Sequence, residues 1–213
     1  LDGEARALSG FEYSGGITTT YRLSTTESSA TFFSFDANTR TYSLSNAAKA
    51  QAPDVSGSDF ADSTVTLGLT HRFIGRPGDQ PTTVRFNFGQ TWYGGAPNTR
   101  FAEISGSHAW QLSQTDQLQT SITLRRTIGL KDQDPQRSYA IGAGWSHAFA
   151  SGDSSLFSLT HSVNSSETVD SDYVSNKVGV NYSFAEPVMG IHFGLGLDYE
   201  NREFAASRFA PGP

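Results

Sequence analysis

The feature that most constrains this chain is an alternation of apolar and polar residues with a period of two, which recurs through most of its length. Residues 65–70, for example, read VTLGLT, and residues 191–197 read IHFGLGL. Clusters of Gly, Pro, Asn, Asp and Ser separate one such segment from the next, as expected of turns. Because successive side chains of a β-strand point to opposite faces, the pattern predicts strands that each have one apolar and one polar face.

Eight strands are predicted from this alternation after residue 63. Each has an apolar set of aliphatic or aromatic residues, opposed by Gly, Ser, Thr, Asn or a charged residue. No apolar run approaches the roughly 20 residues that a transmembrane helix needs, which excludes helical spanning. The predicted strands cover residues 64–73, 83–92, 101–112, 118–125, 138–149, 157–163, 177–184 and 191–199.

The alternation is less regular before residue 64. Odd positions stay favourable over residues 7–23, which predicts either one long strand or a hairpin that turns at Ser-Gly-Gly, residues 14–16. A further strand contains Phe33, and the apolar parity changes at Tyr42, which predicts a bulge or another hairpin. Residues 46–62 are predicted to form a long polar loop. The whole chain is then expected to contain about 10 to 12 strands.

Composition favours a membrane-facing surface over a soluble one. Only three lysines occur in 213 residues, whereas soluble β-proteins usually protect their exposed faces and edges with lysine. The alternative is a soluble all-β protein, such as a sandwich, whose apolar face packs inside. The formal charge of −6 argues against nucleic acid as a partner, and the absence of cysteine excludes disulfides and thiolate metal sites.

The connections between the predicted strands point to a transmembrane β-barrel. A strand of about 10 residues, tilted by about 45°, crosses the hydrocarbon layer of a bilayer. In outer-membrane barrels, short periplasmic turns alternate with longer extracellular loops. In this chain the short connections at 113–117, 150–154 and 185–190 alternate in order with longer polar ones at 94–100, 131–137 and 164–175.

We therefore expect an all-β fold, an antiparallel transmembrane β-barrel in the cell outer membrane, built as an up-and-down meander in a single domain over residues 1–213. The lipid bilayer is its expected partner. Residues 200–213 are polar and contain no returning strand, so the barrel is expected to lack its closing strand.

Two sets of side chains are candidates for function in such a barrel. The polar face carries charged residues that are expected to line the lumen: Arg22, Arg72, Arg85, Glu103, Arg125, Lys177 and Asp198. Aromatic residues near the strand ends are expected to form girdles at the two water–lipid interfaces, because their rings favour lipid and their polar tips favour water. This predicted girdle comprises Phe73, Trp92, Trp110, Tyr139, Phe149, Tyr182, Phe184 and Tyr199, with Tyr93 beside Trp92 at the outer rim.

Catalytic and metal sites are not expected. His161 and Ser162 are adjacent on one strand and therefore point to opposite faces, which separates a base from its nucleophile. His71, His108 and His147 lie on separate strands and are interpreted as interface residues rather than metal ligands. Glu167, Asp170 and Asp172 lack the spacing of a calcium loop and are interpreted as a solvated acidic loop. No cofactor is expected, and the protein is not expected to be an enzyme.

The segments LFSLTHSV and NKVGVNYSF, with turns such as AEPVMG, resemble hairpins of Gram-negative outer-membrane β-barrels. Within that class, the segment YENREFAASRFAPGP resembles late loops of the barrel in surface lipoprotein assembly modulators. Members of that family carry a tetratricopeptide domain before the barrel and help move lipoproteins to the cell surface. No helical repeat occurs here, so the resemblance concerns the barrel part alone. No motif matches position by position, so no functional residue is carried over.

The resemblance implies a role in the export or surface assembly of proteins. Two alternatives remain open at the level of sequence: a passive, porin-like channel for small solutes, and a surface-binding or adhesion barrel that acts through its outer loops. The charged residues expected in the lumen suit either a conducting channel or a wall that binds a plug, so they do not choose between these roles.

Overall fold

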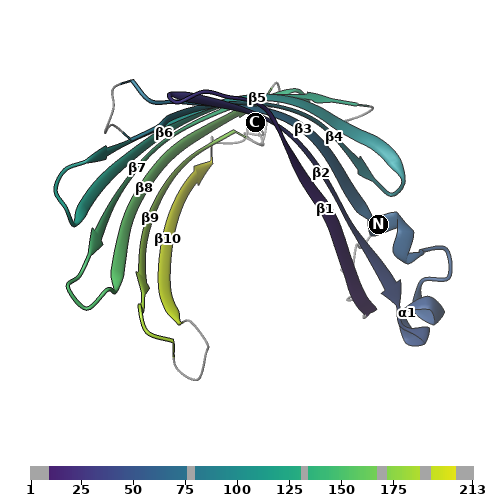
Figure 1. Cartoon of the computed structure of the whole chain (residues 1–213). Coiled ribbons are helices and arrows are strands. Elements are labelled where there is room, and N and C mark those ends of the chain that lie inside the picture. The colour runs from purple at the N-terminus through teal and green to yellow at the C-terminus, as the bar shows by residue number, and fades with distance from the viewer. Residues whose placement is uncertain (1–9, 76–79, 131–133, 167–171, 188–192, 205–213) are drawn as a thin grey trace, which may run out of the picture.

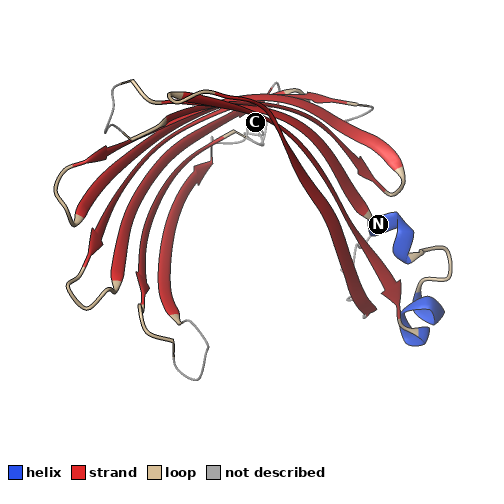
Figure 2. Ribbon diagram, viewed as in Figure 1, coloured by secondary structure: helices blue, strands red, loops and turns tan. Residues whose placement is uncertain are grey.

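The chain folds into one antiparallel sheet of ten strands that follow each other in sequence order. The computed structural model describes residues 10–75, 80–130, 134–166, 172–187 and 193–204. Strands dominate the described chain, and its helical residues gather beyond one end of the second strand (Figure 2). The strands are β1 (Gly10–Thr25), β2 (Ser29–Leu44), β3 (Asp62–Phe73), β4 (Thr82–Tyr93), β5 (Ala96–Gln111), β6 (Asp116–Gly129), β7 (Gln136–Ala148), β8 (Ser154–Ser166), β9 (Tyr173–Ser183) and β10 (Gly194–Phe204).

The predicted meander is confirmed, because every strand pairs antiparallel with its neighbours in sequence. The eight strands expected after residue 63 correspond to β3 through β10, and all eight are longer than predicted. The sheet is strongly curved into an arch, with β1 and β10 as its two edges (Figure 1). These edges do not pair with each other in the part of the chain that the structure describes, so the sheet is open and the predicted barrel is not closed.

The N-terminal region forms two long strands and no extra hairpin. Gly15 and Gly16 pair with Thr39 and Asn38 in the middle of β1 and β2, so the long-strand alternative is correct and a turn at residues 14–16 is excluded. The predicted bulge or hairpin before Tyr42 is wrong, because β2 continues without interruption to Leu44. Its change of parity arises because Tyr42 lies on the polar face of the sheet. The irregularity in this pair falls instead in β1, between residues 22 and 24.

The connection between β2 and β3 contains two short helices where a polar loop was predicted. Helix α1 (Asn46–Gln51) begins at Ser45, whose hydroxyl accepts a hydrogen bond from the backbone N–H of Ala48. A 3₁₀ helix, η1 (Gly57–Phe60), follows. Ala48 and the neighbouring Leu44 are buried, so this connection packs back onto the end of β2. Neither helix has the length and hydropathy needed to cross a membrane.

The connection between β4 and β5 is a tight hairpin turn of two glycines. Gly94 and Gly95 have φ angles of 57° and 75°, which favour glycine and suit the right-handed twist of a two-residue hairpin. The loop predicted at 94–100 is therefore wrong, because residues 96–100 already belong to β5. The alternation of short and long connections fails at this point. The two ends of the sheet are accordingly named here by their structure: the α1 end, with residues 45–61, and the turn end, with residues 112–115 and 149–153.

Candidate functional site

The pairing register sorts the strand residues into two faces, since directly opposed residues lie on the same side of a sheet. Ile104 is opposed by Phe86 and Leu124, and further strands extend this apolar face in the same way. Glu103 is opposed by Asn87 and Arg125 on the other, polar face. The amphipathic strands predicted from the alternation therefore align their apolar sides across the sheet.

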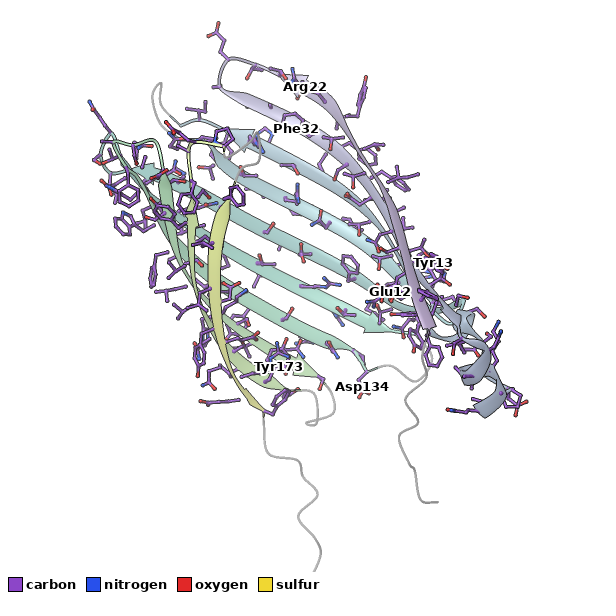
Figure 3. All side chains as sticks on the ribbon, turned by 90° about the horizontal axis from the view of Figure 1, so that it is seen from below. Glu12, Tyr13, Arg22, Phe32, Asp134 and Tyr173 are labelled. Carbon is purple, nitrogen blue, oxygen red and sulfur yellow. The ribbon has the colours of Figure 1, made fainter. Side chains whose placement is uncertain are left out.

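The two faces differ in exposure as well as in chemistry. Large apolar side chains are exposed on the apolar face, as with Phe88 at 60% and Leu197 at 74%, whereas Thr70 on the polar face is only 7% exposed. Side chains on the concave side of a curved sheet crowd together, which accounts for this difference. Figure 3 looks into the arch, with Glu12 on the inner side of β1 and Tyr13 on its outer side. The polar face is thus the concave one.

All seven charged candidates share the polar, concave face, and four of them form ion pairs between neighbouring strands. Arg125 lies 3.8 Å from Glu103, and Lys177 lies 3.3 Å from Asp198. Glu103 also accepts a hydrogen bond from the Asn87 amide at 2.9 Å. The register places the remaining three, Arg22, Arg72 and Arg85, on the same face.

The other three candidates, all arginines, lie in one area of the polar face, around β2 to β4. Arg85 donates from Nε to the hydroxyl of Thr70 at 3.1 Å. The guanidinium carbons of Arg22 and Arg72 lie 5.8 Å and 5.7 Å from the ring centroid of Phe32, within cation–π range. Phe32 was not singled out from the sequence, where Phe33 carries the apolar parity. The pair of adjacent phenylalanines is the signal that one of them must face the polar side.

Phe101 is a second aromatic residue on the polar face that the sequence did not identify. Arg125 lies over its ring at 3.8 Å from the centroid. A side chain at Gly89 would place its β-carbon 2.3 Å from the Cζ atom of Phe101, so the ring covers the glycine across the strand pair. A glycine opposite an aromatic residue at this register is the sequence signal for such a cover.

A cavity of about 550 Å³ lies at the α1 end of the polar face, beside the β1 edge. The guanidinium of Arg40 contacts the Asp62 carboxylate at 2.6 Å, and both residues line the cavity. Glu12 and Tyr42 complete its polar lining, together with Tyr93. The placement of Tyr93 in an outer girdle is therefore wrong, because its side chain shares the polar face with this cavity.

At the turn end, the apolar face carries a belt of histidine and aromatic rings, hereafter the ring belt. Its histidines come from the alternate strands β3, β5 and β7, and each stands two residues before an aromatic residue, the last of which, Phe149, directly follows β7. The closest contact, between His108 and Trp110, has ring centroids 4.5 Å apart in an edge-to-face arrangement. The ring belt comprises His71, Phe73, His108, Trp110, His147 and Phe149.

Each histidine of the ring belt has a polar partner on the neighbouring strand. The Nδ1 atom of His71 lies 2.9 Å from the hydroxyl of Thr31, and the Nδ1 atom of His108 lies 2.8 Å from the hydroxyl of Thr82. His147 bonds the carboxylate of Asp116 at 2.8 Å, and this carboxylate also accepts from the indole N–H of Trp145. The imidazoles therefore sit among rings with Nδ1 satisfied. In the described residues, no three His, Asp or Glu side chains gather as metal ligands would.

The structure brings several girdle candidates together at the turn end. Phe149 contacts Tyr182 at 5.8 Å and Tyr182 contacts Phe184 at 5.0 Å between centroids, which extends the ring belt. At the α1 end, Trp92 and Tyr139 lie on the apolar face near the ends of their strands. Tyr199 also lies on the apolar face, but mid-strand rather than at a rim, because β10 continues to Phe204.

His161 and Ser162 lie on opposite faces of β8, as expected. His161 is on the apolar face, where its Nδ1 lies 2.9 Å from the side-chain oxygen of Asn176. Of the acidic loop, Glu167 and Asp170 fall outside the described residues. Asp172 is described and accepts a hydrogen bond from the Ser166 hydroxyl at 2.8 Å. This bond joins the last residue of β8 to the residue before β9.

The turn between β7 and β8 is held by one carboxylate, that of Asp153. It accepts hydrogen bonds from the backbone N–H of Ala185, from the Tyr182 hydroxyl and from the Ser151 hydroxyl, at 2.7–2.9 Å. These donors, the Ala185 N–H first, hold the pKa of Asp153 below its usual value because they favour the ionised form. The carboxylate thereby links two adjacent connections at the turn end.

Comparison with known proteins adds no relative to this description. No family model, curated protein or solved structure matches the chain. The arrangement of its two faces is therefore the basis on which a function is inferred.

Proposed function

We propose that this chain forms the wall of a β-barrel in the outer membrane of a Gram-negative bacterium, with its apolar convex face against lipid and its polar concave face lining a water-filled passage. The observation that carries the proposal is the sidedness of the sheet. Exposed large apolar residues cover the convex face of the central strands, while ions, hydroxyls and glycines occupy the concave face.

This arrangement is unfavourable in water and favourable in a bilayer. Full burial of a Leu, Ile or Phe side chain contributes about 1.5–3 kcal/mol, which each exposed residue of the convex face forgoes in aqueous solution. Among the described residues, the buried hydrophobic ones are Leu44, at the end of β2, and Ala48, in α1, so neither forms a core between two sheets. A soluble all-β protein needs a core between sheets, whereas lipid supplies the missing apolar contact here.

For the role of the passage we propose the export or surface assembly of proteins. The resemblance to surface lipoprotein assembly modulators suggested this role from sequence. The wide separation of the edge strands β1 and β10 supports a large passage (Figure 1), because the lumen of a barrel widens with the number of strands that complete it.

A passive channel for small solutes is the second candidate. The concave face favours it in one respect, since the ion pairs Glu103–Arg125 and Lys177–Asp198 neutralise each other on a wall that is otherwise rich in Gly, Ser and Thr. Outside the area of Arg22, Arg72 and Arg85, such a wall attracts neither sign of charge strongly. Steady single-channel conductance of the protein in planar bilayers, without bound protein cargo, would favour this role over export.

The membrane location can be tested with two adjacent cysteine substitutions, because the chain has no cysteine of its own. Ile122→Cys lies on the apolar face of β6 and Ser121→Cys on the polar face, one residue away. Each variant is labelled with an environment-sensitive fluorophore and refolded into phosphatidylcholine vesicles. We expect the label at residue 122 to emit at short wavelength and to be quenched by brominated acyl chains, and the label at 121 to be quenched by aqueous iodide.

The matched pair also shows what would contradict the proposal. If iodide quenches both labels equally, the sheet is not embedded in the bilayer. If lipid quenches the label at 121 and water reaches the label at 122, the sidedness is inverted and the polar face does not line a passage.

A further inference from the structure

Three arginines lie on the apolar face at the α1 end, where the alternation of the sequence does not place charge. They are Arg100 on β5, Arg126 on β6 and Arg137 on β7, and all three are exposed. Arg126 and Arg137 are directly opposed in the register, so their β-carbons are about 5 Å apart. Two like charges in this position destabilise a strand pair unless something between them carries the opposite charge.

The protein does not supply that charge within the described strands. The carboxylates on the apolar face belong to Asp116, at the opposite end of the sheet, and to Glu203, on the edge strand β10. The ion pairs between described residues involve neither Arg126 nor Arg137. Arg100 donates from Nε to the side-chain oxygen of Gln90 at 2.9 Å, which leaves its charge uncompensated as well.

An apolar groove of about 650 Å³ runs from these arginines toward the middle of the sheet. Arg126 and Arg137 line it, so both side chains border an apolar groove on the face that we place against lipid. Most of the remaining lining is apolar and includes Phe86, Phe88, Ile104, Leu124, Tyr139 and Val163. Glu103 and Arg125, which form an ion pair with each other, and two serines also contribute to it. The combination of paired cations with an apolar groove is complementary to an anionic headgroup attached to a hydrocarbon chain.

We propose that this surface binds a phosphate-bearing membrane lipid, with the phosphate between Arg126 and Arg137 and an acyl chain in the groove. The guanidinium fork matches phosphate oxygens bidentately, and two forks facing one anion replace repulsion with two charge-assisted contacts. Arg100 lies diagonally beside the pair and adds to the positive field. The occupant is a lipid rather than free phosphate, because the apolar lining of the groove suits an acyl chain, which free phosphate lacks. This inference rests on the proposed membrane location.

The test compares lipids retained by the protein after extraction from vesicles of equal parts phosphatidylglycerol and phosphatidylcholine into mild detergent, measured by native mass spectrometry. The variant is Arg126→Gln/Arg137→Gln. Its matched control is Arg22→Gln/Arg72→Gln, which removes the same charge from the polar face. We expect the wild type and the control to retain phosphatidylglycerol preferentially. In the variant, the ratio of retained phosphatidylglycerol to phosphatidylcholine should be about tenfold lower, because each arginine attracts an anionic surface.

Three outcomes would overturn the lipid site. They are equal retention of both lipids by the wild type, an unchanged preference in the variant, and displacement of phosphatidylglycerol by inorganic phosphate, which would indicate an anion site without a lipid. The fluorophore at Ile122→Cys is read in the same vesicles. If it reports lipid while the preference is absent, the lipid site fails alone; if it reports water, the proposed membrane location fails.

Discussion

The two ends of the apolar face are built differently. At the turn end, the ring belt places imidazoles among aromatic rings and satisfies Nδ1 of each through a neighbouring strand. At the α1 end, Trp92 and Tyr139 are accompanied by three arginines whose charge the described strands leave open. Aromatic residues and arginine both suit a water–lipid boundary, since each joins an apolar body to a polar tip. The polar groups at the turn end are therefore satisfied within the protein, whereas the described strands leave the arginine charges at the α1 end without an ion pair.

The largest expected effect comes from moving an arginine from the α1 end to the middle of the face. Ile122→Arg places a guanidinium in the middle of the apolar face, where the directly opposed residues, Gly106 and Ile141, offer it no polar side chain. We expect a loss of about 2–4 kcal/mol in the free energy of unfolding from bilayers, as for arginine at a bilayer midplane. The measurement is urea titration of protein folded in phosphatidylcholine vesicles.

Thr123→Arg is the matched control for this substitution, because residue 123 is adjacent but lies on the polar face. Its expected effect is small, since the new side chain reaches water. A similar loss of unfolding free energy in both variants would mean that the loss comes from strand packing and not from lipid contact. It would contradict the difference proposed between the ends and the middle of the apolar face.

A smaller effect is expected from the coupling energy between two neighbouring rings of the ring belt. His108 and Trp110 are in edge-to-face contact at 4.5 Å, a geometry worth about 0.5–1.5 kcal/mol beyond burial. A double-mutant cycle of His108→Leu and Trp110→Leu should recover a coupling of this size in the free energy of unfolding. The reference cycle is Ile122→Ala with Leu124→Ala, two residues apart on the same face, for which the coupling should be close to zero.

Acidification should act on the turn end and spare the arginines. The lowered pKa of Asp153 means that its hydrogen bonds stabilise the fold above the pKa of an unfolded aspartate, about 4, and that this contribution is lost as pH falls through the folded value. We expect protease cleavage in the connection 149–153 to increase at low pH, with an acid-active protease as the probe. The Asp153→Asn variant should be cleaved readily at this connection, and without this pH dependence. If the variant keeps the wild-type pH profile, the pH dependence belongs to another group.

The sequence predicted the meander and the sidedness of its strands well. Both follow from local alternation, which every strand from β3 to β10 carries in its central residues. Strand ends were predicted less well, because pairing continues by backbone hydrogen bonds after the alternation stops, as in residues 96–100 of β5. Curvature depends on the whole sheet, and no local pattern encodes it.

Side chains that contradict the alternation were the ones that sequence reasoning missed. Phe32, Tyr42 and Phe101 are aromatic residues on the polar face, and each lies near an arginine there. Arg126 and Arg137 are the reverse, cations on the apolar face. A period-two pattern averages over such positions, since it assigns a face by the majority of residues. Their identification required the register of both neighbouring strands.

The smallest expected effect tests the sign of the charge at the α1 end. Arg126→Leu removes the repulsion between directly opposed cations, so in phosphatidylcholine bilayers it should raise the free energy of unfolding by about 0.2–1 kcal/mol. In bilayers that contain phosphatidylglycerol, the same substitution removes one of two guanidinium groups around a bound phosphate and should lower it. Leu124→Ala, a neighbouring change within the groove, should be destabilising in both lipids. Because no substitution in the ring belt alters charge compensation in this way, a reversal of sign with lipid composition at residue 126 alone is the outcome that separates the two ends. A change of the same sign in both bilayers would mean that Arg126 acts through strand packing and not through an anion.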